Sequence, residues 1–557
     1  MKTVFFFDPD GYSLTGPKLM GRQSAGAGFL RAAIKGAGET PVAVSVMTQS
    51  AAKAFQAHME TAGAGVRYEI LAARNLDQLA QADVYFRPDV VLTDDARWRL
   101  RMGPAAYSLC GLTHTLASDR VMDVFARLPF EPLMAWDALI CTSKVARAVL
   151  TRVFDEAEAQ HRWRTGEPTA ALPRPMLPII PLGVHCEDYA FSKADQAAAR
   201  AELGLDDDTV AALSSGRISM NAKAHPLPMM TGLQAAAQRL GAGGTGRKLA
   251  LIIAGQAETQ GTLEMFRRAA AELCPDVRTI FVDGADAGRY RQTWAAADIF
   301  MSLSDNIQET FGLTPIEAMA AGLPALVSDW NGYKDTVRDG IDGFRVPTWA
   351  PEPGGGERLS RDFQTGEIAY GMYLARASSA VAVDIPVLAE RLDALIVDAD
   401  LRRRMGAAGQ ARAREAYDWA VVYAQYRELW TELDAIRRRA QADPKTAAWL
   451  AAAPRRSPDH LGPFDAFESF PTRHVGPRTV VGLGSVASSE AYRALIEQET
   501  LRHLWVVPQV FEAFQRCLAD GPLSVADLSA KSGVDLTPTI EAVARLAKLD
   551  AVTLRAP

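Results

Sequence analysis

The chain has 557 residues, of which 48% are hydrophobic and 23% are charged, and its formal net charge is -6. This length exceeds what one hydrophobic core usually supports, so we expect two or three domains, and the composition is that of a globular protein. The small negative charge gives no general reason to expect nucleic acid or an anionic membrane as a partner.

The cysteines and the N-terminus bear on the compartment. Five cysteines lie far apart, without the paired spacing of a zinc site or a redox dithiol, which favours buried thiols in a reducing environment. The apolar run in MKTVFFFDPDG is much shorter than that of a signal peptide, and no segment approaches the ~20 apolar residues of a membrane span. We therefore expect a cytoplasmic protein and leave open a peripheral position at the inner face of the membrane.

Short apolar runs alternate with longer amphipathic stretches over most of the chain. The runs are KTVFFFD, TPVAVSVM, ADVYFRPDVVL, WDALICTS, MLPIIPLGV, AALSSGR, KLALIIAG, RTIFVDG, ADIFMSLS and LPALVSD. Strands alternating with helices over this length predict an α/β protein with two doubly wound parallel sheets. The Pro- and charge-rich stretch FDEAEAQHRWRTGEPTAALPRP is interpreted as a surface insertion near the join. We place the two domains at residues 1–185 and 186–435.

The last third of the chain contains less regular segments. WAPEPGGGERLSRDFQTG predicts a flexible insertion in the second domain, and residues 436–475 are predicted to be a linker. Residues 476–557 show three helical patterns and a short strand, an order that resembles a winged helix. Its last helical pattern has only Arg545 and Lys548 against acidic neighbours, so we expect a protein contact or dimerisation rather than DNA binding.

Two stretches of the first domain could face a ligand. GPKLMGRQSAGAGFLRAAI predicts a Gly-rich loop that runs into a helix, but it lacks the spacing of a dinucleotide or ATP site. His114, in CGLTHTLAS, follows a probable strand end. It could carry a proton, bind a hydroxyl group or be a hydrogen-bonded structural residue, and the local sequence favours the last.

In the second domain, LSSGRISMNAKAHP follows a probable strand and places Arg217 and Lys223 six residues apart across a loop. Two cations so placed could converge on one anion, although the pair taken alone favours a solvated loop.

A short helix is predicted in DNIQETFGLTPIEAMAAGLP. Thr314 is the expected N-cap, Pro315 the first helical residue, and Glu317 the acid of a capping box. The free N–H groups of such a helix start attract anions, and Gly312 would let a phosphate approach the main chain. Glu309 precedes the helix and has no capping role, so its carboxylate could accept hydrogen bonds from sugar hydroxyl groups.

Taken together, these stretches resemble the family 4 glycosyltransferases, which are retaining enzymes of the GT-B fold, over roughly residues 1–435. The most specific match is DNIQETFGLTPIEAMAAGLPALVSDWNGYKDTVRDGIDGFRV, which looks like the family's motif of two glutamates separated by seven residues. ICTSKVAR, IIPLGVH, SSGRISMNAK and LIIAG support it. The resemblance implies two Rossmann-like domains that face a cleft, and residues 476–557 have no counterpart in it.

The resemblance also implies roles for individual residues. Glu309 would contact the hydroxyl groups of the donor sugar, Glu317 the ribose, and His114 the donor sugar from the first domain. Arg217 and Lys223 would neutralise the donor diphosphate. The remaining predicted donor contacts are the main chain at Gly216, Phe311, Gly312 and Leu313, and a loop with Gly21, Ser24 and Gly26 that would close over the phosphates. The sequence departs from the family in that loop, where AGAG replaces adjacent glycines, and in the insertion after Trp349.

The implied reaction is transfer of a sugar from a nucleoside diphosphate to a carbohydrate, lipid-linked or protein acceptor, with retention at the anomeric carbon. No cofactor or metal is expected, because Arg217 and Lys223 can stabilise the leaving diphosphate. Two alternatives stay open: another GT-B activity on nucleotide sugars, such as an epimerase or hydrolase, and a non-catalytic scaffold that presents the C-terminal module. The C-terminal module could also bring together copies of the chain or another protein.

Overall fold

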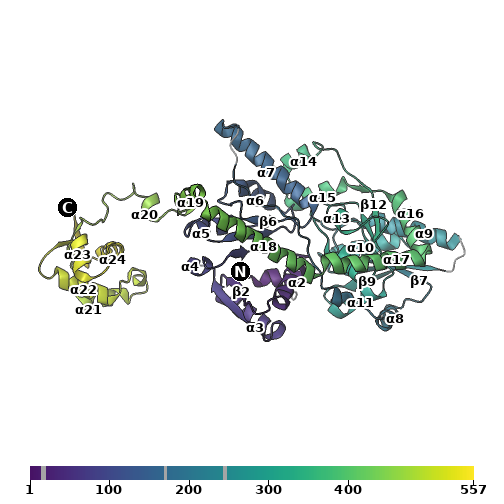
Figure 1. Cartoon of the computed structure of the whole chain (residues 1–557), viewed down its shortest axis with the longest axis horizontal. Coiled ribbons are helices and arrows are strands. Elements are labelled where there is room, and N and C mark those ends of the chain that lie inside the picture. Colours follow the sequence, from purple (N-terminus) through teal and green to yellow (C-terminus); the bar gives the residue numbers. More distant parts are fainter. Residues whose placement is uncertain (14–20, 74, 119, 169–171, 243–246, 557) are drawn as a thin grey trace. The chain divides into compact units, whose positions relative to one another are not determined.

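The computed structural model describes the chain except for residues 14–20, 74, 119, 169–171, 243–246 and 557. It divides into two compact units, Met1–Ser457 and Pro458–Pro557. Figure 1 shows both units and labels many of their helices and strands.

The first domain of the larger unit is built on a parallel sheet in the order β3-β2-β1-β4-β5-β6. Its central strands are apolar and buried on both faces, as expected where helices cover a parallel sheet. The strands are β1 (Thr3–Phe6), β2 (Val42–Val46), β3 (Tyr68–Ala72), β4 (Val84–Phe86), β5 (Ser108–Leu112) and β6 (Ala138–Ile140). The helices are α1 (Pro9–Tyr12), α2 (Gly21–Lys35), α3 (Gln49–Ala62), α4 (Leu76–Leu79), α5 (Thr93–Leu100), α6 (Val121–Arg127) and α7 (Lys144–Thr165).

The second domain repeats this arrangement in the order β12-β11-β10-β7-β8-β9. Its strands are β7 (Thr209–Ser215), β8 (Lys248–Gly255), β9 (Arg278–Asp283), β10 (Ile299–Ser302), β11 (Ala325–Ser328) and β12 (Gly343–Val346). Its helices are α8 (Lys193–Glu202), α9 (Pro226–Ala242), α10 (Gln260–Leu273), α11 (Ala287–Ala296), α12 (Leu313–Ala320), α13 (Tyr333–Thr336), α16 (Ile385–Val397) and α17 (Ala399–Arg412). Both strand orders reverse at the centre, between β1 and β4 and between β7 and β10. The predicted fold class, two Rossmann-like doubly wound domains, is confirmed.

The predicted and observed elements differ in several places. Strands β3, β5 and β12 were not among the predicted runs, although a strand end was expected before His114, whereas MLPIIPLGV forms only isolated bridges at Met176, Ile179 and Val184. Its prolines have no N–H to donate to a ladder, which explains the lost strand. The predicted surface insertion begins inside α7, which continues to Thr165 and ends at Gly166 with φ 71°.

The insertion after β12 was predicted to be flexible, but it folds into a helical hairpin. It contains β13 (Thr348–Trp349), α14 (Glu357–Gln364), α15 (Tyr370–Ser379) and β14 (Ala382–Val383), and the two short strands pair antiparallel. The Phe363 ring of α14 stacks on Tyr373 of α15 with 4.9 Å between ring centroids. This aromatic contact joins the two helices.

After α17, the chain returns to the first domain. The π-helical turn Ala413–Tyr417 leads into α18 (Trp419–Ala442), which packs against α2, β4 and β5 (Figure 1). The Trp430 ring lies 5.7 Å from Phe5 and 5.5 Å from Phe86, measured between centroids. Residues 436–475, predicted to be a linker, contain the end of α18, α19 (Pro444–Ala451) and α20 (Pro463–Ala466).

The chain thus crosses between the domains twice, and the two crossings lie side by side. Val184 donates its N–H to Tyr417 O at 2.8 Å and accepts the N–H of Trp419 at 2.9 Å.

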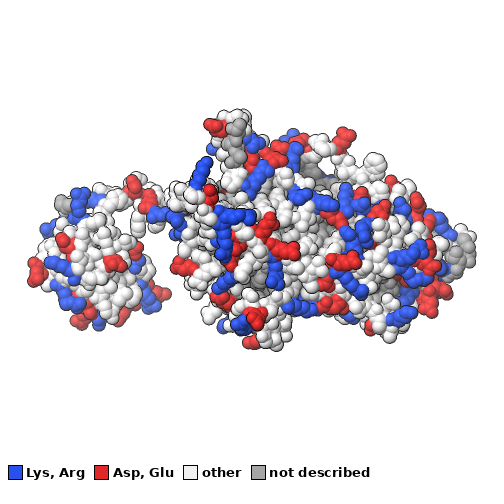
Figure 2. Space-filling model, viewed as in Figure 1, with Lys and Arg blue, Asp and Glu red and all other residues white. Residues whose placement is uncertain are grey.

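The smaller unit has an antiparallel sheet in the order β16-β15-β17 and a helical core. Its elements are β15 (Val480–Leu483), α21 (Ser489–Ile496), α22 (Pro508–Leu518), β16 (Leu523–Ser524), α23 (Val525–Ser532), α24 (Leu536–Lys548) and β17 (Val552–Arg555). Phe511, Phe514 and Leu546 are buried at its centre. Figure 2 shows acidic and basic side chains interspersed on its visible face. Its assignment as a winged helix stays a prediction.

Candidate active site

The loop between β10 and α12 is held by Asn306, which is fully buried. Its Oδ1 accepts the N–H groups of Gln308 at 3.0 Å and Glu309 at 3.2 Å, and its Nδ2 donates to Lys223 O at 2.6 Å. This amide therefore joins the loop that carries Glu309 to the loop that carries Lys223. Both loops follow the central strands of the second sheet, at the edge where ligands bind in such folds.

Glu309 and Lys223, both predicted site residues, form an ion pair of 2.5 Å between Oε2 and Nζ. The side chains are only 14% and 19% exposed. Burial alone would lower the pKa of Lys223, but Glu309 and Tyr333 together outweigh it and raise this pKa above its ordinary value. No described residue hydrogen-bonds the other carboxylate oxygen, Glu309 Oε1. The pair is a fixed cation beside an acceptor oxygen that a ligand hydroxyl could reach.

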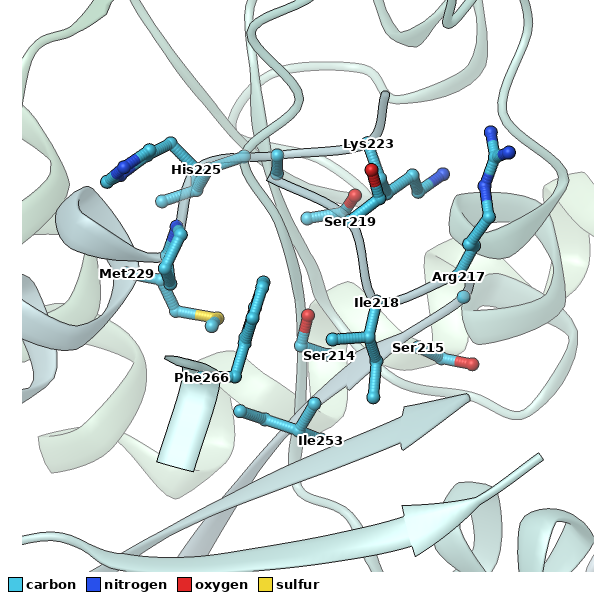
Figure 3. A pocket seen from close by; sticks show the side chains of 15 residues that line it. Ser214, Ser215, Arg217, Ile218, Ser219, Lys223, His225, Met229, Ile253 and Phe266 are labelled. Atoms are coloured by element: carbon cyan, nitrogen blue, oxygen red, sulfur yellow. The ribbon is translucent and has the colours of Figure 1, made fainter. Parts of the chain in front are cut away.

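Arg217 lies on the same loop as Lys223, at the rim of a pocket between β7 and α9. Figure 3 shows the charged ends of both side chains directed away from Met229 and Phe266, which belong to the apolar lining of this pocket. Arg217 Nη2 donates to Gln308 Oε1 at 3.1 Å. Gly216, between strand and loop, has φ 128°, and a β-carbon there would lie 3.3 Å from Lys223 Cε. The predicted cationic loop is therefore close-packed.

Helix α12 begins differently from the prediction. Its N-cap is Gly312, at φ 83°, and Thr314 and Glu317 make no capping box. Because the left-handed Gly312 starts the helix two residues early, Thr314 is already inside it, and its Oγ1 has no hydrogen-bond partner among the described residues. The predicted N-cap is wrong, but the helix N-terminus still follows Phe311 and Gly312, where the resemblance places the diphosphate.

Glu317, released from capping, faces the 3₁₀ turn Cys186–Tyr189 and interacts with the Tyr189 side chain. Burial raises the pKa of Glu317 to about 6, against the lowering effects of Tyr189 and Lys223. Tyr189 was not predicted, because nothing near it in the sequence signals a site. The ribose role of Glu317 stays a prediction.

His114 follows β5 in the first domain, as predicted. Its Nε2 lies 2.8 Å from Pro88 O, which can only accept, so Nε2 carries a proton and Nδ1 is the acceptor of a neutral ring. Burial lowers the pKa of His114, which also favours the neutral form. The next residue, Thr115, donates to Gln308 O at 3.1 Å, so the His114 loop contacts the Glu309 loop across the domain boundary.

The predicted phosphate loop of the first domain is wrong in part. Gly21, Ser24 and Gly26 lie in α2, while residues 14–20 are outside the described part of the chain. A β-carbon on Gly26 would lie 2.1 Å from Gly11 O, so close packing of α1 on α2 explains this glycine. Their donor contact stays a prediction.

Within the described residues, no group of three or more His, Cys, Asp or Glu is arranged to hold a metal ion. Nor is any helix there long and apolar enough to cross a membrane.

Comparison with known proteins identifies the second domain. Residues 195–352 match the family model of the glycosyl transferases group 1. The chain is 30% identical over 249 residues to a D-inositol 3-phosphate glycosyltransferase of Nocardia farcinica, covering 44% of this chain and 45% of that protein. It is 26% identical over 304 residues to an alpha-maltose-1-phosphate synthase of Mycobacterium tuberculosis, covering 54% and 64%. The chain thus spans about half to two thirds of the length of these relatives.

Among solved structures, Anabaena HepE in complex with UDP-glucose aligns with 78% of this chain and all of its own, at 17% identity and a TM-score of 0.49. The matched segment 195–352 contains Arg217, Lys223, Glu309 and Glu317. Residues 195–352 of this chain are therefore similar to the group 1 glycosyl transferases, in agreement with the resemblance seen in its sequence.

Proposed function

We propose that the chain transfers a sugar from a nucleoside diphosphate to an acceptor with retention of configuration, in polysaccharide or glycoconjugate synthesis. The observation that carries this proposal is the Lys223–Glu309 ion pair at the start of α12. It sets a cation for the diphosphate beside a carboxylate for the sugar, inside a glycosyltransferase domain.

The positive groups would stabilise the leaving diphosphate. A lysine ammonium has three N–H donors, and Glu309 engages one of those of Lys223. Another N–H could reach a phosphate oxygen without breaking the ion pair. Arg217 and the N-terminus of α12 would add charge-assisted hydrogen bonds as negative charge grows on that oxygen. No metal enters this scheme.

The same geometry favours front-face substitution over a covalent intermediate. The ion pair draws the negative charge of Glu309 toward Lys223, which makes this carboxylate a poor nucleophile. In the proposed step, the bond from the anomeric carbon to the phosphate oxygen breaks as the acceptor oxygen bonds on the same face, and the departing phosphate takes the acceptor's proton. Glu309 Oε1 and neutral His114 Nδ1 would accept hydrogen bonds from the sugar.

The test is a screen followed by product analysis. Nucleotide sugars with each common base would be compared by thermal shift, and donors that bind would be incubated with acceptors. These would include an inositol phosphate and a sugar phosphate, since two relatives are named for such compounds. NMR of the product gives the anomeric configuration. Inversion, or a product formed without acceptor, would contradict retaining transfer and point to a hydrolase or epimerase.

Variants locate the site. Glu309→Gln should lower turnover by about 10² or more if its charge acts in the transition state. Lys248→Ala is the control. Lys248 pairs with Asp206 at the first residue of β8, at the amino ends of the strands, whereas the site lies at their carboxyl ends. Equal activities of the two variants would count against this site.

A further inference from the structure

Gln308 connects the donor side of the site to two other parts of the chain. Its Oε1 accepts from Arg217 Nη2 at 3.1 Å, and its Nε2 donates to the Tyr370 hydroxyl at 3.4 Å. Its main-chain carbonyl accepts from Thr115 Oγ1 at 3.1 Å. This residue, next to Glu309, therefore contacts the cationic loop, the helical insertion and the first domain at once.

Tyr370 continues the connection. It is the first residue of α15 in the insertion, and its hydroxyl donates to Ala117 O, in the loop that follows His114. Its ring lies 6.2 Å from Phe363 of α14, between centroids. The insertion thus reaches the first domain through this phenol, 253 residues away along the chain.

The direction of every hydrogen bond in this chain of contacts is fixed. Arg217 can only donate, so the amide oxygen of Gln308 must face it, and the amide nitrogen must face Tyr370. The Tyr370 oxygen then accepts, and its proton goes to Ala117 O, which can only accept. A phenol can do both at once, and phenylalanine can do neither.

We infer that Tyr370 is a positioning residue of the transfer reaction. It holds the Gln308 amide so that Arg217 faces the donor diphosphate, and it holds the first-domain loop of His114 and Ala117 against the second domain. That the ligand is a sugar donor rests on the proposed function, but the contacts assigned to Tyr370 can be measured without any substrate. The insertion is thereby part of the site.

The test is Tyr370→Phe, with Tyr373→Phe as the matched control. Each variant loses one hydroxyl group from α15, and in the control the aromatic ring at position 373 still stacks on Phe363. Amide hydrogen exchange of the whole chain should rise in peptides covering 115–118 and 306–309 for Tyr370→Phe only, because local opening controls exchange. Binding of inorganic pyrophosphate, measured by calorimetry, should weaken by about three- to tenfold. Where a donor turns over, its KM should rise more than kcat falls.

Unchanged exchange in both segments would overturn the inference, even if activity fell. So would an equal rise in both variants, since that reports general loosening of α15. If the wild type turns over no nucleotide sugar and yet the exchange differs as expected, the positioning role stands and the proposed function fails.

Discussion

Lys223 and Glu309, 86 residues apart in the sequence, form a 2.5 Å ion pair in which each side chain limits the freedom of the other. Neutralising one partner releases the charge of the other, so the two single variants should change the affinity for pyrophosphate in different ways. Glu309→Gln frees the ammonium and should leave pyrophosphate binding equal or tighter while turnover falls.

Lys223→Ala removes a cation and leaves the Glu309 carboxylate facing the anion. It should weaken pyrophosphate binding by about tenfold or more. Calorimetry at constant pH measures both variants. Losses of binding of similar size in the two would show that the pair acts only as a structural contact.

Glu317 predicts a pH dependence. Its pKa is raised to about 6 by burial, and hydroxyl groups of a bound ribose would favour the charged carboxylate. Nucleoside diphosphate should therefore bind with the release of a proton, and its affinity should fall as pH drops below about 6, by at most tenfold per pH unit.

Glu317→Gln should bind more weakly at pH 7.5 and show a flat profile between pH 7.5 and 5. A titration series with the diphosphate selected in the donor screen measures this. The same slope in wild type and variant would assign the titration to another group, such as the phosphate itself.

Two features require glycine at position 312: its left-handed backbone conformation and the close approach of the Tyr333 ring. It has φ 83°, and a β-carbon there would lie 2.1 Å from Tyr333 Cε1. Gly312→Ala should cost about 3 kcal/mol or more of unfolding free energy and displace the start of α12, because strain and steric overlap add. Gly340→Ala separates the two causes, since Gly340 has φ 74° and nothing within 4 Å of the added carbon.

Gly340→Ala should therefore lower the unfolding free energy by about 1–2 kcal/mol, which is the contribution of backbone strain alone. Urea unfolding of both variants tests this. Equal costs would mean that Tyr333 yields to the added methyl group.

Arg99 and Asp137 form a fully buried ion pair in the first domain, with Nη1 2.6 Å from Oδ1 and Nη2 2.7 Å from Oδ2. Arg99→Met would leave the carboxylate buried without its cation and should cost about 3–5 kcal/mol. Arg152→Ala is the control, because Arg152 and Glu156 form an exposed pair on α7, and such pairs contribute little. An Arg99→Met protein as stable in urea as the control would refute this role.

The fold could be predicted because buried parallel strands are short, apolar and regularly spaced. Glu309, Lys223 and Arg217 could be predicted because their charges follow strand ends, where the fold places ligands. The structure does bring Glu309 and Lys223 into contact and links Arg217 to the same loop through Gln308.

The rest depended on contacts that local sequence does not contain. The start of α12 was misplaced because Thr-Pro-x-Glu looks like a capping box, whereas the backbone of Gly312 decides it. Tyr189 and Tyr370 were missed because their partners, Glu317 and Ala117, come from distant segments. A single uncharged side chain that contacts a distant segment leaves no periodicity or motif in the local sequence.

The pairing of Val184 with Tyr417 and Trp419 has a consequence for how the domains move. Two separate connections would allow sliding as well as rotation, but here they are hydrogen-bonded into one short ladder, and we expect this ladder to act as a single hinge. We therefore expect the domains to open by rotation about one axis, with the contacts between them loosening together. Substrate entry and product release would then follow this one movement. The Val184 ladder would influence the rate of the catalytic cycle without contacting substrate or product.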